Sequence, residues 1–154
     1  MKVKTKVEII KPTKKQSNDI LFLVDELANY EKLKLPTKSA KQRLLSDIFS
    51  KKPLINVLLA RADDKYIGYA FYFFSYSSFL AKPTLYLEDI FILEEYRRVG
   101  AGKLFFKELN KIAKAKNCGR IEFIVLDWNK SAISFYNKLG IKELDGWKFF
   151  RKSF

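Results

Sequence analysis

The chain has 154 residues, of which 48% are hydrophobic and 16% aromatic, so it can bury the core of one domain over residues 1–154. It carries a formal net charge of +13, with one cysteine and no histidine. This composition excludes an internal disulfide, a Cys/His zinc site and every catalytic triad that needs an imidazole. No apolar run reaches the about 18 residues of a spanning helix, and we expect a cytoplasmic protein without a metal site.

The first half of the chain predicts an edge strand, two helices and a hairpin. Alternation of charged and apolar residues predicts the strand over residues 2–10, which Pro12 ends. Helical spacing predicts helices over residues 19–33 and 39–49. The buried face of the first helix is expected to consist of Ile20, Leu23, Val24 and Leu27. Two β-prone runs at 54–62 and 66–76 predict a hairpin that turns at residues 63–65.

The second half predicts strands alternating with helices. A central strand is expected over residues 84–93 and a helix over 103–117, with Phe105 and Leu109 facing inward. A further strand at 120–128, a short helix at 129–140 and a final strand at 147–154 follow. This order predicts a mixed α/β fold with helices on both faces of the sheet and a strand–loop–helix crossover at its centre.

The crossover loop, residues 97–103, reads Arg-Arg-Val-Gly-Ala-Gly-Lys. Glycines at a helix start let backbone N–H groups point at an anion, because no Cβ stands in the way. Lys103 in the first turn places a positive charge at the positive end of the helix dipole, which is unfavourable. A bound pyrophosphate would explain it, because the anion attracts both. The alternative is an ordinary glycine-bearing helix start with solvated arginines, since a Gly-x-Gly pair is a short motif.

The motif Arg97-x-x-Gly100-x-Gly102 after a strand resembles the acetyl-CoA signature of the GNAT acetyltransferase superfamily. The resemblance is closest to the spermidine/spermine (diamine) N-acetyltransferases and extends over residues 19–33, 86–103, 127–140 and 146–150. It implies the GNAT fold, with a twisted mixed sheet of about six or seven strands and about four helices. It also implies an acetyl-CoA-dependent enzyme without a metal, and a homodimer.

The resemblance assigns the coenzyme to the loop and to the strand before it. The pyrophosphate is expected on the backbone amides of Arg98, Val99, Gly100, Ala101, Gly102 and Lys103. The pantetheine arm is expected along Ile90, Phe91 and Ile92, as a peptide adds to a sheet edge, with a hydrogen bond from Asn129. The basic surplus of the chain would then favour association with a polyanionic coenzyme.

Two residues are candidates for proton transfer. The resemblance implies that Tyr136 protonates the departing thiolate, whereas Tyr136 taken alone could belong to the core stripe of a helix. Glu88 lies within an apolar strand and would attract the substrate ammonium and, through water, help to remove its proton; the alternative is a cross-strand ion pair with a lysine. Neighbouring strand residues face opposite sides, so Asp89 is expected to pack on the other face.

Further residues match the amine-binding positions of the diamine enzymes. These residues are Tyr30, Glu31, Trp128 and Asp145. Each has a plain alternative: a solvated helix end for Tyr30 and Glu31, a buried core tryptophan for Trp128, and an Asp-Gly turn for Asp145.

The amine itself stays open. Residues 77–85 contain no acid and one lysine where the diamine enzymes carry an acid, so a polycation meets fewer counter-charges here. The sequence is compatible with several acceptors: a diamine or polyamine, a lysine-like molecule, or a protein lysine or N-terminus. It is also compatible with an acyl-CoA donor that has a longer acyl group. A basic nucleic-acid-binding module is the alternative from another class. The acids would be misplaced on its phosphate-facing groove.

Overall fold

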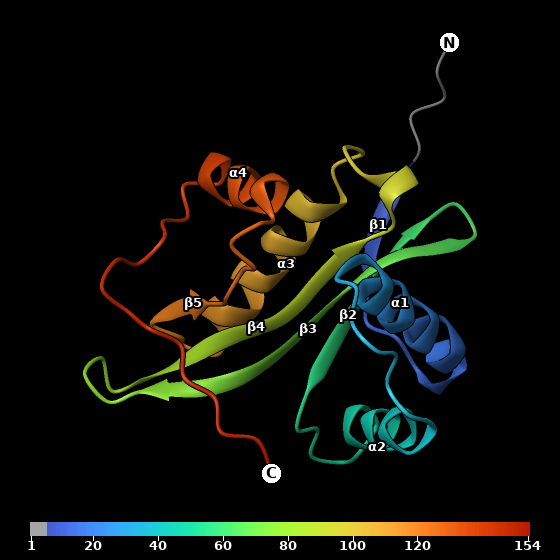
Figure 1. Cartoon of the computed structure of the whole chain (residues 1–154), viewed down its shortest axis with the longest axis horizontal. Helices are drawn as coiled ribbons and strands as arrows, with labels where there is room; N and C mark the ends of the chain where they lie inside the picture. The colour runs from blue at the N-terminus through green and yellow to red at the C-terminus, as the bar shows by residue number, and fades with distance from the viewer. Residues whose placement is uncertain (1–5) are drawn as a thin grey trace. The chain divides into compact units, whose positions relative to one another are not determined.

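A mixed five-stranded sheet, in the order β1-β2-β3-β4-β5, organises the first part of the chain (Figure 1). The computed structural model describes residues 6–154. The chain divides into two units, Met1–Phe123 and Ile124–Phe154, and each is considered by itself. The strands are β1 (Val7–Ile10), β2 (Asn56–Ala62), β3 (Lys65–Ser77), β4 (Lys82–Ile92) and β5 (Arg120–Glu122). Neighbours are antiparallel from β1 to β4, and β5 runs parallel to β4.

Three α-helices belong to the first unit and one to the second. The helices are α1 (Ser17–Tyr30), α2 (Lys38–Ile48), α3 (Ala101–Ala115) and α4 (Lys130–Lys138). Short 3-10 turns, η1 (Lys14–Gln16) and η2 (Glu94–Tyr96), precede α1 and follow β4. None of the helices in the described residues is both long and apolar enough to cross a membrane.

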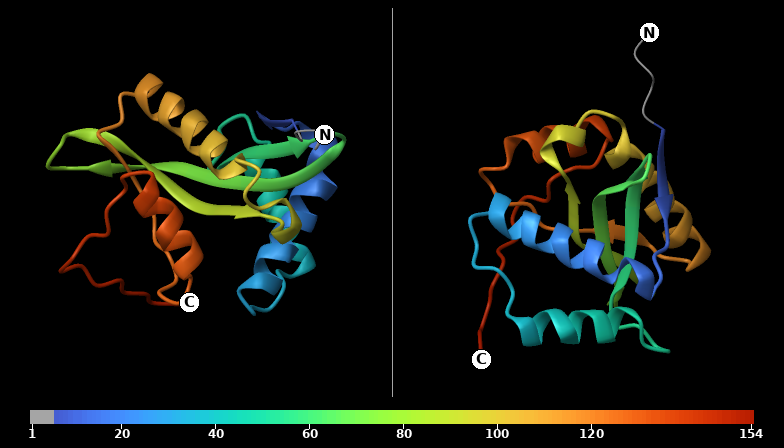
Figure 2. Two further views of the ribbon diagram at one scale, coloured as in Figure 1. Left: turned by 90° about the horizontal axis from the view of Figure 1, so that it is seen from above. Right: turned by 90° about the vertical axis from the view of Figure 1, so that its right-hand side faces the viewer.

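Helices α1 and α3 cover opposite faces of the sheet, as the sequence predicts (Figure 2). Ile20 and Leu23 of α1 are fully buried and pack in one cluster with Tyr69, Phe71 and Phe91. Phe105 and Leu109, predicted to face inward on α3, are also fully buried. Successive strand residues point to opposite faces of the sheet. Because helices cover both faces, buried apolar residues follow one another in β2 and β3.

Strand β4 contains a β-bulge at Glu88. Phe71 of β3 pairs with Asp89, and the next residue, Tyr72, pairs with Leu87, so Glu88 is the extra residue. Strand β5 pairs with β4 only at Thr84, Leu85 and Tyr86, before the bulge. Among the strand pairs of residues 6–154, the edge of β4 from Leu87 to Ile92 on that side has no partner.

The sequence overestimated the strands at the C-terminal end. The expected strand over 120–128 ends at Glu122, because its partner β4 bulges two residues beyond the last pair. The expected final strand over 147–154 has no regular structure, and Trp147 and Phe150 are exposed. Aromatic β-propensity forms a strand only where a neighbouring edge supplies hydrogen bonds. The sheet therefore has five strands and not six or seven. The start of the expected strand over 2–10 lies partly outside the described residues.

The pairing of β3 with β4 gives a test of the sheet. A Cβ on Gly68 would lie 2.5 Å from the carbonyl oxygen of Phe91, which is backbone and cannot rotate away. We expect Gly68→Ala to lower the free energy of unfolding by about 2 kcal/mol or more in urea denaturation. Gly119→Ala is the matched control, because its Cβ would meet the flexible end of Leu80 at 2.8 Å. Equal losses in the two variants would contradict this reading of the sheet.

Candidate active site

Helix α3 begins at a backbone well suited to hold an anion. Its N-cap is Gly100, with a left-handed φ of +94°, and Arg98 also has a positive φ, of +67°. Helices α2 and α4 have side-chain caps from Thr37 and Asn129, whereas α3 has neither a side-chain cap nor an acid in its first turn. The first N–H groups of a helix have no intrahelical acceptor, so this end presents free donors and the positive end of the dipole.

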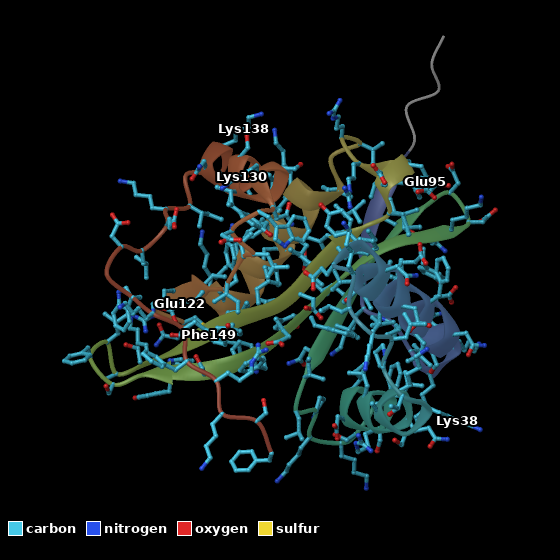
Figure 3. All side chains as sticks on the ribbon, viewed as in Figure 1. Lys38, Glu95, Glu122, Lys130, Lys138 and Phe149 are labelled. Atoms are coloured by element: carbon cyan, nitrogen blue, oxygen red, sulfur yellow. The ribbon has the colours of Figure 1, made fainter. Side chains whose placement is uncertain are left out.

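The loop is joined directly to the open edge of β4. Strand β4 ends at Ile92, and η2 leads from it to Arg97, with Glu95 exposed on this turn (Figure 3). Arg97 Nε donates a hydrogen bond of 3.2 Å to the carbonyl oxygen of Ile92. Phe91 is buried in the cluster under α1, whereas Ile90 and Ile92 are half-buried. The predicted pantetheine edge and the predicted pyrophosphate loop are therefore consecutive.

The two carboxylates of β4 differ in environment. Glu88 on the bulge is exposed, while Asp89 is half-buried and accepts a long hydrogen bond, 3.4 Å, from the Tyr69 hydroxyl. Burial, and after it the negative charges of Glu88 and Glu31, raise the pKa of Asp89 to about 6, although the hydrogen bond from Tyr69 lowers it. Burial, followed by the charge of Asp89, raises the pKa of Tyr69 well above its usual value. Tyr69 is fully buried, so Asp89 faces the core while Glu88 faces solvent.

The end of α1 lies against the same part of β4. The ring centroids of Tyr30 and Phe91 are 6.0 Å apart, and the Arg97 guanidinium carbon lies 4.5 Å from the centroid of the Tyr30 ring. Glu31 follows at the helix end, and burial raises its pKa. The structure thus brings Tyr30, Glu31, the β4 carboxylates and the loop into one region of the first unit. It does not leave Tyr30 as a solvated helix end.

The remaining predicted residues belong to the second unit. Tyr136 lies on α4, between the helix ends at Lys130 and Lys138 (Figure 3), and burial raises its pKa to about 12. Its ring centroid is 5.4 Å from that of Phe135.

Three further residues of the second unit were predicted as site residues. Asn129 caps α4, its Oδ1 accepting from the backbone N–H of Ala132 at 3.2 Å. Trp128 is 50% exposed, so it is not the buried core tryptophan of the plain alternative. Asp145 lies in a turn with Gly146, whose φ is +81°.

Sequence reasoning missed two contacts at this site. Tyr69 beside Asp89 depends on the cross-strand register, which the bulge shifts, and no sequence signal places a bulge at Glu88. The stacking of Arg97 on Tyr30 joins residues far apart in the chain. The lone signal for it was the arginine that opens the glycine motif. In residues 6–154, no cluster of three or more Asp, Glu, Cys or His side chains could hold a metal ion.

Known proteins share both the sequence pattern and the fold. Residues 22–141 match the acetyltransferase (GNAT) family. Thialysine N-epsilon-acetyltransferase of Bos taurus is 37% identical over 144 residues, which cover 86% of this chain and 84% of that protein. Spermidine/spermine N(1)-acetyltransferase-like protein 1 of Homo sapiens is 34% identical over 143 residues, 86% of this chain but 20% of that protein.

A solved structure agrees at the level of the fold. The aminoglycoside N-acetyltransferase AAC(6')-Iy, in complex with CoA, superposes with a TM-score of 0.79 over 96% of this chain and 95% of its own, at 21% identity. The mixed α/β fold predicted from the order of strands and helices, and the GNAT fold implied by the resemblance, are therefore confirmed. The family match covers most of the chain, so this protein belongs to the GNAT family and is an acetyl-CoA-dependent N-acetyltransferase.

Proposed function

We propose that this enzyme transfers the acetyl group of acetyl-CoA to the primary amine of a small molecule, either a diamine or polyamine or a lysine-like compound. The amine nitrogen attacks the thioester carbonyl carbon directly, the C–N bond forms, and the C–S bond breaks to release the coenzyme as a thiol. The carrying observation is the uncapped start of α3 at Gly100, continuous with the unpaired edge of β4 and its carboxylates. No covalent acyl-enzyme is proposed, since burial raises the pKa of Cys118 and disfavours its thiolate.

The donor set at the loop fits the coenzyme. The backbone N–H groups from Arg98 to Lys103 would hold the pyrophosphate, and the edge Ile90–Ile92 would pair with the pantetheine arm, to which Asn129 also donates. The N–H near Phe91 would polarise the thioester carbonyl. Acetyl-CoA, when bound, supplies the activated acetyl group. Support comes from the positive φ of Gly100 and from the exposed Lys103 beside it.

Two side chains are assigned to the protons. An alkylammonium has a pKa near 10 and must lose a proton before its nitrogen can attack, so the exposed Glu88 attracts it and accepts that proton through water. Tyr136, whose pKa is raised to about 12, stays protonated at neutral pH and donates its proton to the leaving sulfur. The amine is expected to contact Tyr30, Glu31, Trp128 and Asp145.

The choice of a small amine rests on the relatives and on charge. The similar proteins carry the names of thialysine and spermidine/spermine acetyltransferases. Glu31, Glu88 and Asp89 form a local acidic region in a chain of net charge +13, which suits an ammonium and not a nucleic acid. A protein lysine or N-terminus is the second candidate, because the acid of the diamine enzymes is missing from residues 77–85. We infer a cytoplasmic enzyme that acts as a homodimer.

The proposal is tested by release of free thiol from acetyl-CoA. The acceptors are putrescine, spermidine, lysine, thialysine and a basic peptide. We expect thiol release with at least one small amine and one acetamide product per thiol by mass spectrometry. Turnover confined to the peptide would replace the small amine by a protein substrate, and no turnover with any acceptor would contradict the proposal.

The acid role of Tyr136 predicts a specific loss. Tyr136→Phe is expected to lower kcat by about 10–100-fold, within the range for one acid–base group, with less than about a twofold change in the Kd for coenzyme A. Steady-state kinetics and calorimetry measure the two quantities. The matched control is Tyr76→Phe, which alters a tyrosine that is 66% exposed on β3. Unchanged turnover in Tyr136→Phe would mean that water supplies the proton.

The raised pKa of Asp89 predicts a pH dependence of stability. A carboxyl with a folded-state pKa of about 6, against an ordinary value of 3.8, binds more protons in the folded state than in the unfolded state. Its contribution to stability is therefore full below about pH 4 and is lost as pH rises through about 6. Asp89→Asn should therefore stabilise the fold by about 1–2 kcal/mol at pH 8 and hardly at pH 4, less than the whole shift implies because the side chain is half-buried. Urea denaturation measures this. The control is Glu143→Gln, which alters an exposed carboxylate that does not act on the pKa of Asp89, and the same profile in both variants would refute the assignment.

A further inference from the structure

The two adjacent arginines of the glycine motif, Arg97 and Arg98, differ in exposure and in the direction of their side-chain contacts. Arg98 is exposed at the mouth of the loop with a φ of +67°. Arg97 is half-buried, and its side chain reaches the end of β4 and the Tyr30 ring. Its Nε donates to the carbonyl oxygen of Ile92 at 3.2 Å, and its guanidinium carbon lies 4.5 Å from the Tyr30 ring centroid and 6.0 Å from that of Phe91. The charge of Arg97 is therefore directed at protein groups, away from an anion at α3.

Arg97 joins three parts of the first unit that the proposed reaction uses separately. Its backbone leads directly into residues 98–103, its Nε holds the last residue of β4, and its guanidinium lies on Tyr30, the last residue of α1. Glu31 follows Tyr30 at the end of α1. A planar guanidinium can stack on an aromatic face while one N–H keeps a hydrogen bond, which neither lysine nor glutamine can do.

We infer that Arg97 is a positioning residue for the amine: it holds Tyr30 and Glu31 in place against the end of β4. The inference rests on the proposed function and adds to it a link between the coenzyme loop and the acceptor side. The Arg97 side chain contacts the Ile92 carbonyl oxygen and the Tyr30 ring, both of which are protein groups. It acts through Tyr30, and its loss should weaken the amine complex while leaving the backbone donors of α3 in place.

A positioning role and a role in stability alone predict different effects on the KM for the amine. A contact that only supports the fold would lower the melting temperature and leave the Michaelis constants of the folded enzyme alone. A contact that fixes Tyr30 changes the KM for the amine, and the change depends on an aromatic ring at position 30. Partly desolvated cation–π contacts of this kind correspond to about 3- to 10-fold in an equilibrium constant.

The experiment is a double-mutant cycle on the amine KM at saturating acetyl-CoA. Arg97→Gln keeps a donor for the Ile92 carbonyl but removes the charge. We expect it to raise the amine KM about 3- to 10-fold in the wild-type and Tyr30→Phe backgrounds, where a ring is present. In the Tyr30→Leu background the same change should have little further effect. The Kd for coenzyme A, from calorimetry, should change less than about twofold in Arg97→Gln.

Other outcomes overturn the inference. An equal KM increase in the Tyr30→Leu background, no increase in the Tyr30→Phe background, or a loss of coenzyme A affinity as large as the KM change would each do so. If Arg97→Gln does not fold, Arg97→Met carries the same cycle, because it removes the cation and keeps an unbranched side chain that can pack at a half-buried position. Wild-type protein that acetylates no amine overturns the proposed function and this inference together. An active wild type with an additive cycle overturns this inference alone.

Discussion

The β-bulge at Glu88 is the constraint on which the site depends. Without it, β5 could continue along β4 beyond Tyr86, and the edge from Leu87 to Ile92 would be closed by strand pairing. The bulge ends that pairing and exposes Glu88, yet it lets Phe91 return to the core beneath α1. One extra residue thus produces an open edge, an exposed carboxylate and a rigid support at consecutive positions. The loop that begins at Arg97 follows this strand closely in the chain, so the strand determines where the loop lies.

The same region handles charges of both signs in a strongly basic chain. The start of α3 presents backbone donors and no acid, which suits a polyanion, while Glu31 and Glu88 lie close enough to Asp89 to raise its pKa. Burial is the largest cause of the raised pKa of Asp89, about 6, and it also raises the pKa of Glu31. An arriving ammonium would lower the pKa of both groups, so amine binding and proton release from these carboxyls are coupled.

Local sequence patterns predicted much of this fold. The features that they did not predict depend on contacts between residues far apart in the chain. Helical spacing placed Ile20 and Leu23 in the core, and paired β-prone runs placed the β2–β3 hairpin, because both signals are short in range. The glycine motif, together with the separate blocks at residues 19–33 and 127–140, indicated the family. The bulge, the stacking of Arg97 on Tyr30 and the hydrogen bond from Tyr69 to Asp89 all depend on register between distant segments. The final strand failed because its aromatic residues have propensity but no partner edge.

The raised pKa of Tyr136 sets a condition on the proposed acid step. A phenol with a pKa of about 12 loses its proton to an ordinary thiolate, with a pKa near 8.5, only at a cost of roughly 5 kcal/mol. The burial that raises the phenol pKa would also raise the thiol pKa, since desolvation disfavours either anion. The difference between the pKa of the phenol and the pKa of the thiol is then smaller in a site that excludes water. Transfer from Tyr136 is therefore most favourable when sulfur and hydroxyl share one dry environment, and it competes poorly with water when the site is open.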